Sequence, residues 1–61
     1  YSNEELAVWS ILESDPMSIE KVIERSKLSS TFVSRTLSKL ELDNMVESFP
    51  GHLYKKSNHD F

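Results

Sequence analysis

The spacing of apolar residues predicts a short amphipathic helix near the start of the chain. Its wide apolar face comprises Leu6, Val8, Trp9, Ile11 and Leu12. Just before this face, Ser2 and Glu5 have the S-x-x-E spacing of a capping box, in which each side chain bonds the other residue's free backbone amide. We expect the helix to run to about Ser14, because Pro16 pushes the preceding Asp15 out of the helical region.

Two further helices are predicted, separated by a tight connection at residues 27–28. Ser18 is a good N-cap for a helix over residues 19–26, and Ser29 caps a longer helix that runs to about Leu42. Their apolar stripes have helical spacing, at Ile19, Val22 and Ile23 and at Val33, Leu37 and Leu40. A short helix, a tight turn and a longer helix form the helix-turn-helix pattern.

The last third of the chain predicts a β-hairpin. The residues expected to face inward from its first strand are Met45, Val46 and Phe49. Glu47 is expected to face outward. Residues 50–52, Pro-Gly-His, have turn chemistry, since proline presets one dihedral angle and glycine takes a position that needs positive φ. The return strand follows over residues 53–56.

Three helices followed by a hairpin is the element order of a winged helix-turn-helix, a fold used mostly to hold nucleic acid. We therefore expect a mostly α fold with a small two-stranded wing, and Met17 as a one-residue strand stub. This domain should span residues 1–56, and residues 57–61 should form a disordered tail. Because the wing is short, its tip should protrude little.

Composition limits the classes of protein to which the chain can belong. Its 61 residues form one small domain. Cysteine is absent, which excludes disulfides and thiolate metal sites, and no apolar run is long enough to cross a membrane. The chain starts at Tyr1 and not at Met, so we expect it to be part of a longer protein, by default a cytoplasmic one.

Charge is unevenly distributed along this chain, whose net charge is −3. Residues 1–24 carry −5, residues 25–40 carry +4 without a carboxylate, and residues 41–61 carry −2. The basic segment matters for phosphate attraction, because charges more than a Debye length away, about 8 Å at physiological salt, are largely screened. The alternative is that these cations merely balance the acidic segments on either side.

The third predicted helix carries the candidate nucleic-acid contacts. In a helix-turn-helix, the second of the two helices enters the major groove with its N-terminal half facing base edges, while hydroxyl groups and cations bond phosphate oxygens. The candidates on its polar side are Ser30, Thr31, Ser34, Arg35, Ser38 and Lys39. Lys55 and Lys56 on the return strand would add phosphate contacts or, as strand-edge lysines, prevent edge pairing.

Two aromatic side chains raise a different possibility. Trp9 lies among the apolar neighbours of the first helix, and core packing is its better interpretation. Phe32 lies off the main apolar stripe of the third helix, either tucked beside the first helix or exposed to a partner. An exposed Phe32, one side of Trp9 and the acidic first helix would form the surface of a protein-docking or self-association module without DNA contact.

No catalytic or cofactor-binding pattern is present in the sequence. His52 and His59 are the only histidines, one in the predicted turn and one in the predicted tail, and neither has a carboxylate at a ligand spacing that a helix would fix. The serines lack a base placed by a motif, and the single glycine, Gly51, is too little for a phosphate-binding loop. We therefore predict a non-enzymatic domain without metal or cofactor.

Several segments match the sequence pattern of a known family. They are DPMSIE (15–20), LS (28–29), LSKLEL (37–42), MV (45–46), FPG (49–51) and YK (54–55). Together they resemble the C-terminal winged-helix domain of the DNA-processing protein A (DprA/Smf) family. Its pattern has P-L-S-I-D before the second helix, L-E-L at the end of the third, then G-L-V and L-P-G-x-Y. Asn44 replaces the usual turn glycine, which a left-handed asparagine tolerates, and one extra residue precedes Tyr54.

The resemblance implies that a parent protein carries a Rossmann-like domain that binds single-stranded DNA and helps to load a recombinase during natural transformation. This chain would be an accessory DNA-binding module in DNA processing and recombination, with no catalytic residue to carry over. Its partners would be single- or double-stranded DNA, with the recombinase or another domain of the parent as further candidates, and no membrane. A third interpretation, the reading head of a dimeric transcription repressor, lacks the dimer helices that such proteins usually need.

Overall fold

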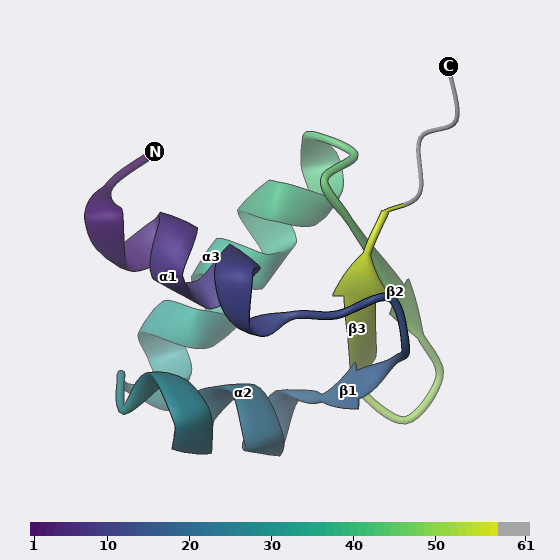
Figure 1. Cartoon of the computed structure of the whole chain (residues 1–61), viewed down its shortest axis with the longest axis horizontal. Helices are drawn as coiled ribbons and strands as arrows, with labels where there is room; N and C mark the ends of the chain where they lie inside the picture. The colour runs from purple at the N-terminus through teal and green to yellow at the C-terminus, as the bar shows by residue number, and fades with distance from the viewer. Residues whose placement is uncertain (58–61) are drawn as a thin grey trace.

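The computed structural model describes residues 1–57 and consists of three helices and one small antiparallel sheet (Figure 1). In chain order the elements are α1 (Asn3–Ile11), β1 (Met17–Ser18), α2 (Ile19–Ser26), α3 (Ser30–Leu42), β2 (Val46–Phe49) and β3 (Leu53–Lys56). The helices lie together on one side of the molecule and the sheet on the other. The expected mostly helical class is confirmed, and the arrangement is consistent with a winged helix.

All three helices begin at a serine cap, as the sequence predicts. The Ser2 amide donates to Glu5 Oε1 at 2.8 Å and the Glu5 amide donates to Ser2 Oγ at 3.1 Å, which completes the capping box of α1. The hydroxyls of Ser18 and Ser29 each accept the backbone amide three residues on, at 3.3 Å and 3.1 Å. These bonds satisfy amides that lack a partner within the helix.

Helix α1 ends at Ile11 and not near Ser14. Leu12 adopts an extended conformation, with ψ at 151°, and its side chain is only 1% exposed. Glu13 then accepts a backbone hydrogen bond from the amide of Lys56 on β3, at 3.0 Å. Burial of Leu12 and pairing with the sheet therefore end the helix before the proline does.

The turns around α3 are made without glycine. Lys27, the C-cap of α2, is left-handed with φ at 59°, and its amide donates to the Ile23 carbonyl at 3.0 Å. Asn44, after α3, is left-handed with φ at 61°, as expected. This conformation costs a residue with a Cβ roughly 1–2 kcal/mol, and glycine avoids most of that cost.

The sheet has three strands, where we expected a two-stranded wing. Residues 17–18 pair with residues 53–54, so the expected stub at Met17 is a two-residue strand, β1. The strand order is β1-β3-β2, which makes β3 the central strand. The hypothesis that Lys55 and Lys56 protect a sheet edge is therefore wrong, because both lie on the central strand.

Strand β2 places alternate residues on opposite faces of the sheet. Val46 is 2% exposed and Glu47 is exposed, as expected. Phe49, which we expected to face inward, is three residues from Val46 and so shares the other face with Glu47, because strands have a two-residue period. Phe49 pairs with Leu53, and the ammonium of Lys55 lies 5.6 Å from the centre of its ring.

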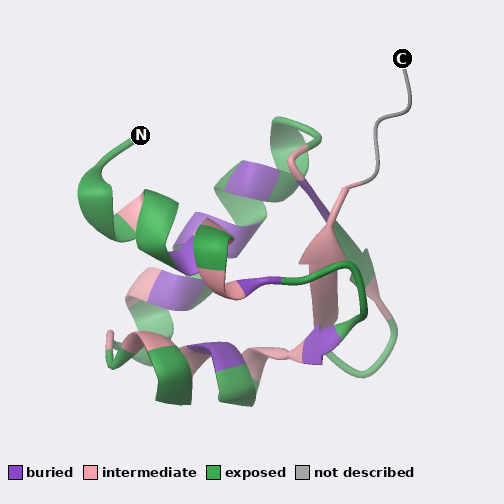
Figure 2. Ribbon diagram, viewed as in Figure 1, coloured by how far each residue is buried: buried purple, intermediate pink, exposed green. Residues whose placement is uncertain are grey.

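One apolar core lies where the three helices meet the sheet (Figure 2). Its buried members are Val8, Leu12, Met17, Val22, Val33, Leu37, Leu40 and Val46. The partly buried side chains packed against it are Trp9, Ile11, Ile19, Ile23, Leu28, Phe32, Met45 and Tyr54. Trp9 therefore packs against the core, as predicted, and Phe32 is also partly buried against the core.

Ser57, which we expected in the disordered tail, is tied to the start of β2. Its amide donates to the carbonyl of Met45 at 3.1 Å. The rest of the expected tail, residues 58–61, lies outside the described residues. Within the described range, no helix is both long and apolar enough to cross a membrane.

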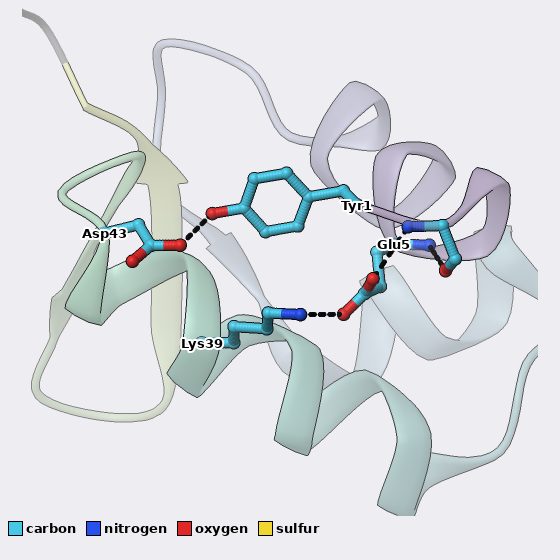
Figure 3. Close-up of polar contacts among 5 residues, drawn as sticks. Tyr1, Glu5, Lys39 and Asp43 are labelled. Carbon is cyan, nitrogen blue, oxygen red and sulfur yellow. Dashed lines mark hydrogen bonds and ion pairs between the residues drawn. The ribbon is translucent and has the colours of Figure 1, made fainter.

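A polar cluster joins the start of α1 to the end of α3 (Figure 3). The ammonium of Lys39 donates to Glu5 Oε2 at 3.1 Å and lies 5.2 Å from the centre of the Tyr1 ring. The Tyr1 hydroxyl donates to the Asp43 carboxylate. Although the cluster is at the surface, the Glu5 side chain is only 16% exposed. The cluster therefore fixes Lys39 on the side of α3 that faces α1.

These hydrogen bonds shift two pKa values in opposite directions. The pKa of Glu5 lies below its ordinary value of 4.5, first because the Ser2 backbone amide donates to the carboxylate and next because Lys39 does. The pKa of Tyr1 lies above its ordinary value of 10.0, chiefly because its hydroxyl donates to Asp43. The ionised form of Glu5 is thus the one that stabilises the fold.

Glu5→Gln should lower the melting temperature at neutral pH, because it removes the charge paired with Lys39 while glutamine keeps the capping box. A depressed pKa gives stability that is present above 4.5 and is lost as the pH falls through the lower, folded value. The difference between the wild type and the variant, measured by circular dichroism, should therefore shrink in acid. Glu4→Gln, one residue earlier in the same helix turn, is the matched control, and an equal effect of both variants at every pH would contradict the ion-pair argument.

Lys27→Gly should stabilise the domain by about 0.5–1 kcal/mol, because glycine relieves the left-handed strain. The higher conformational entropy of glycine in the unfolded chain offsets part of this stabilisation. Lys21→Gly, on the exposed side of α2, should instead destabilise it by about 1 kcal/mol. Urea denaturation of both variants measures the two free energies. A loss of stability in Lys27→Gly would show that the lysine side chain contributes more than its backbone costs.

Candidate nucleic-acid interface

Helix α3 has a buried side and an exposed ridge opposite to it. The buried side is formed by Val33, Thr36, Leu37 and Leu40. The exposed ridge, with i, i+4, i+7 and i+11 spacing, is formed by Thr31, Arg35, Ser38 and Leu42. The first three of these were predicted contacts, whereas Leu42 was not and is 84% exposed. The side of α3 that a nucleic acid would meet is thus polar over its first two turns.

An open groove of about 740 Å³ lies beside this ridge, between α2, the N-terminal half of α3 and the wing. Its lining residues are Ile19, Ile23, Ser30, Thr31, Ser34, Arg35, His52 and Tyr54. Four of the eight predicted contacts, all from α3, are therefore gathered at one site. Two isoleucines form its apolar part, and no carboxylate is among its lining residues.

The wing reaches this groove because its turn is bonded to α2. Gly51 and His52 are both left-handed, with φ at 88° and 59°, which turns the chain sharply back after Pro50. The His52 carbonyl then accepts the backbone amide of Ile19 at 3.0 Å. His52 and Tyr54 consequently line the groove, although we had not predicted either as a contact. The turn chemistry was visible in the sequence, but its pairing with a residue 33 positions earlier was not.

The other predicted contacts from α3 lie outside the groove. Ser38 is exposed on the ridge, one turn beyond the lining residues. Lys39 points toward α1, where Glu5 holds its ammonium at 3.1 Å (Figure 3). A phosphate would therefore have to compete with Glu5 for this cation.

The wing lysines occupy two further places. Lys55 lies over the ring of Phe49, on the outer face of the sheet. The ammonium of Lys56 lies 4.2 Å from the centre of the Trp9 ring, whose Nε1 donates to the Met45 carbonyl at 3.3 Å. The structure thus brings neither lysine to the groove.

The basic segment 25–40 is partly neutralised within the fold. Arg25 Nη1 lies 3.8 Å from Glu13 Oε1, and Lys39 is paired with Glu5, so for these two cations the balancing interpretation applies. Lys27 lies in the turn between α2 and α3. Arg35 makes no hydrogen bond or ion pair with any described residue, and among the described residues that line the groove it is the one lysine or arginine.

Comparison with protein families matches the chain to the DprA winged helix domain over residues 2–52. Comparisons with curated proteins and with solved structures give no match. The matched range contains all three helices, β1, β2 and the wing turn, and it stops just before β3. The match covers most of the chain, which therefore belongs to the family of DprA winged helix domains.

Proposed function

We propose that the domain binds DNA weakly, through the first two turns of α3 and the adjoining groove, as an accessory module of a DNA-processing protein. The observation that carries the proposal is the groove itself. It combines Arg35, which has no partner among residues 1–57, with hydroxyls of Ser30, Thr31 and Ser34, and it lacks a lining carboxylate. Guanidinium and hydroxyl groups are the side chains that usually bond phosphate oxygens.

The charge of the groove indicates the strength of this binding. Each phosphate neutralised by a cation contributes a slope of roughly −0.9 to the dependence of log affinity on log salt for duplex DNA and about −0.7 for single strands. One free arginine therefore supports a slope near one and modest affinity. Such a contact suits a module that assists a stronger DNA-binding domain of the same protein.

Membership of the family supports a role for the parent protein in natural transformation. In this proposal the parent handles incoming single-stranded DNA in the cytoplasm and passes it to a recombinase. The winged-helix domain performs no catalysis and needs neither metal nor cofactor. Its contribution is to hold DNA, or a neighbouring domain, close to the parent's main binding site.

A docking function is the second candidate, and the exposed ridge of α3 favours it in a revised form. Phe32 and Trp9, which we had placed on the docking surface, are partly buried against the core. Leu42 is instead the most exposed large apolar residue of the described part, at 84%. If the groove is the functional surface, Leu42→Ser should leave DNA binding unchanged. If docking is the function, the same substitution should abolish self-association.

Arg35→Ala should weaken DNA binding and reduce the salt slope by about one phosphate contact, because Arg35 is the unpaired cation of the groove. Lys39→Ala should change the slope far less, because Glu5 already neutralises this lysine. Fluorescence anisotropy with a labelled duplex and a labelled single strand, from low to physiological salt, measures both. Equal slopes for Arg35→Ala and the wild type would contradict the groove as the interface, and no binding at low salt would contradict a DNA function altogether.

Glu5→Gln should increase DNA affinity at low salt, because it frees the Lys39 ammonium for a phosphate, and it should steepen the salt slope by roughly one contact. Glu4→Gln changes the net charge equally but pairs with no cation in the described structure, so it is the matched control. The same anisotropy titration compares the two variants. If both raise affinity equally, the effect is one of net charge and not of Lys39.

A further inference from the structure

The wing turn holds His52 against the helix-turn-helix. Its backbone is left-handed, a conformation in which histidine is several-fold enriched over most residues with a Cβ. The hydrogen bond from the Ile19 amide to the His52 carbonyl fixes this turn beside the start of α2. His52 thereby lines the same groove as the first turns of α3, although strand β2 separates it from α3 in the chain.

The groove contains one permanent positive charge and one that depends on pH. Arg35, from α3, carries the permanent charge, and Tyr54, from β3, is the other titratable side chain beside His52. From α2 the groove is lined only by Ile19 and Ile23, which do not titrate. Among these residue types only imidazole changes its charge between about pH 5 and pH 8. Protonation of His52 would therefore double the positive charge of the groove.

We propose that His52 is a second phosphate-binding residue of this groove, which acts when its imidazole is protonated. DNA binding is then tighter in mildly acidic solution than in mildly alkaline solution. This inference rests on the proposed function, because it assigns a pH-dependent contact to the same site.

The physical reason is a coupling between phosphate and proton. A protonated imidazole would add its charge to that of the Arg35 guanidinium at the same site. A bound phosphate offsets both charges, so it favours the protonated imidazole, and by linkage the proton favours the bound phosphate. The carboxylate-free lining strengthens the coupling, since no internal anion takes the place of phosphate.

The test measures binding of a labelled duplex and a labelled single strand at about pH 5.5 and about pH 8, on either side of the ordinary histidine range, at constant ionic strength. The affinity of the wild type should rise roughly fivefold to tenfold in acid. This factor follows if a bound phosphate raises the proton affinity of the imidazole by nearly tenfold. His52→Asn should remove this increase, and asparagine retains the left-handed backbone. His59→Asn, the same substitution at the chain's other histidine, should leave the increase intact.

Proton NMR of the histidine rings provides the second readout. The midpoint of the His52 titration should move to higher pH when DNA is present, and that of His59 should stay where it is. A full pH effect in His52→Asn would overturn the inference, while salt-dependent binding that still needs Arg35 would leave the proposed function standing. Absence of DNA binding at both pH values would overturn both proposals.

Discussion

Strand β3 is the constraint on which the rest of the domain depends. It pairs with β1 on one side and β2 on the other, and the Glu13 carbonyl extends the pairing to Lys56. A chain of 61 residues buries a small core, so backbone pairing that joins distant segments matters more than in a larger domain. The β1–β3 pairing also sets the wing turn beside α2. The groove consequently exists only when the whole domain is folded.

The pairing of charges within the fold explains how a chain with a net negative charge keeps a surface that can bind phosphate. Glu5 and Glu13 neutralise Lys39 and Arg25, and the wing lysines lie over aromatic rings. These pairs are at the surface, where ion pairs are weak and screened by salt. What distinguishes Arg35 is therefore not its charge but the absence of carboxylates from its side of α3. The net charge of the chain gives no indication of this local difference.

Local signals in the sequence were sufficient for the helices, and non-local contacts account for the rest. The serine caps and apolar spacing give α2 and α3 with their starting residues, because each helix start depends on a few adjacent groups. The early end of α1 depends on burial of Leu12 against residues far along the chain. In the same way, Ser30, Thr31, Ser34 and Arg35 follow from helix geometry, while His52 joins them only through its bond to Ile19.

The position of Trp9 makes it an intrinsic fluorescence probe of the fold. It is the only tryptophan of the chain, and its ring lies between α1, the start of β2 and the end of β3. Its Nε1 bond to Met45 and the ammonium above its ring are lost when the helix separates from the sheet. Trp9 is not among the residues that line the groove. Its emission spectrum thus follows the docking of α1 on the sheet and distinguishes unfolding from occupancy of the groove in a single unlabelled sample.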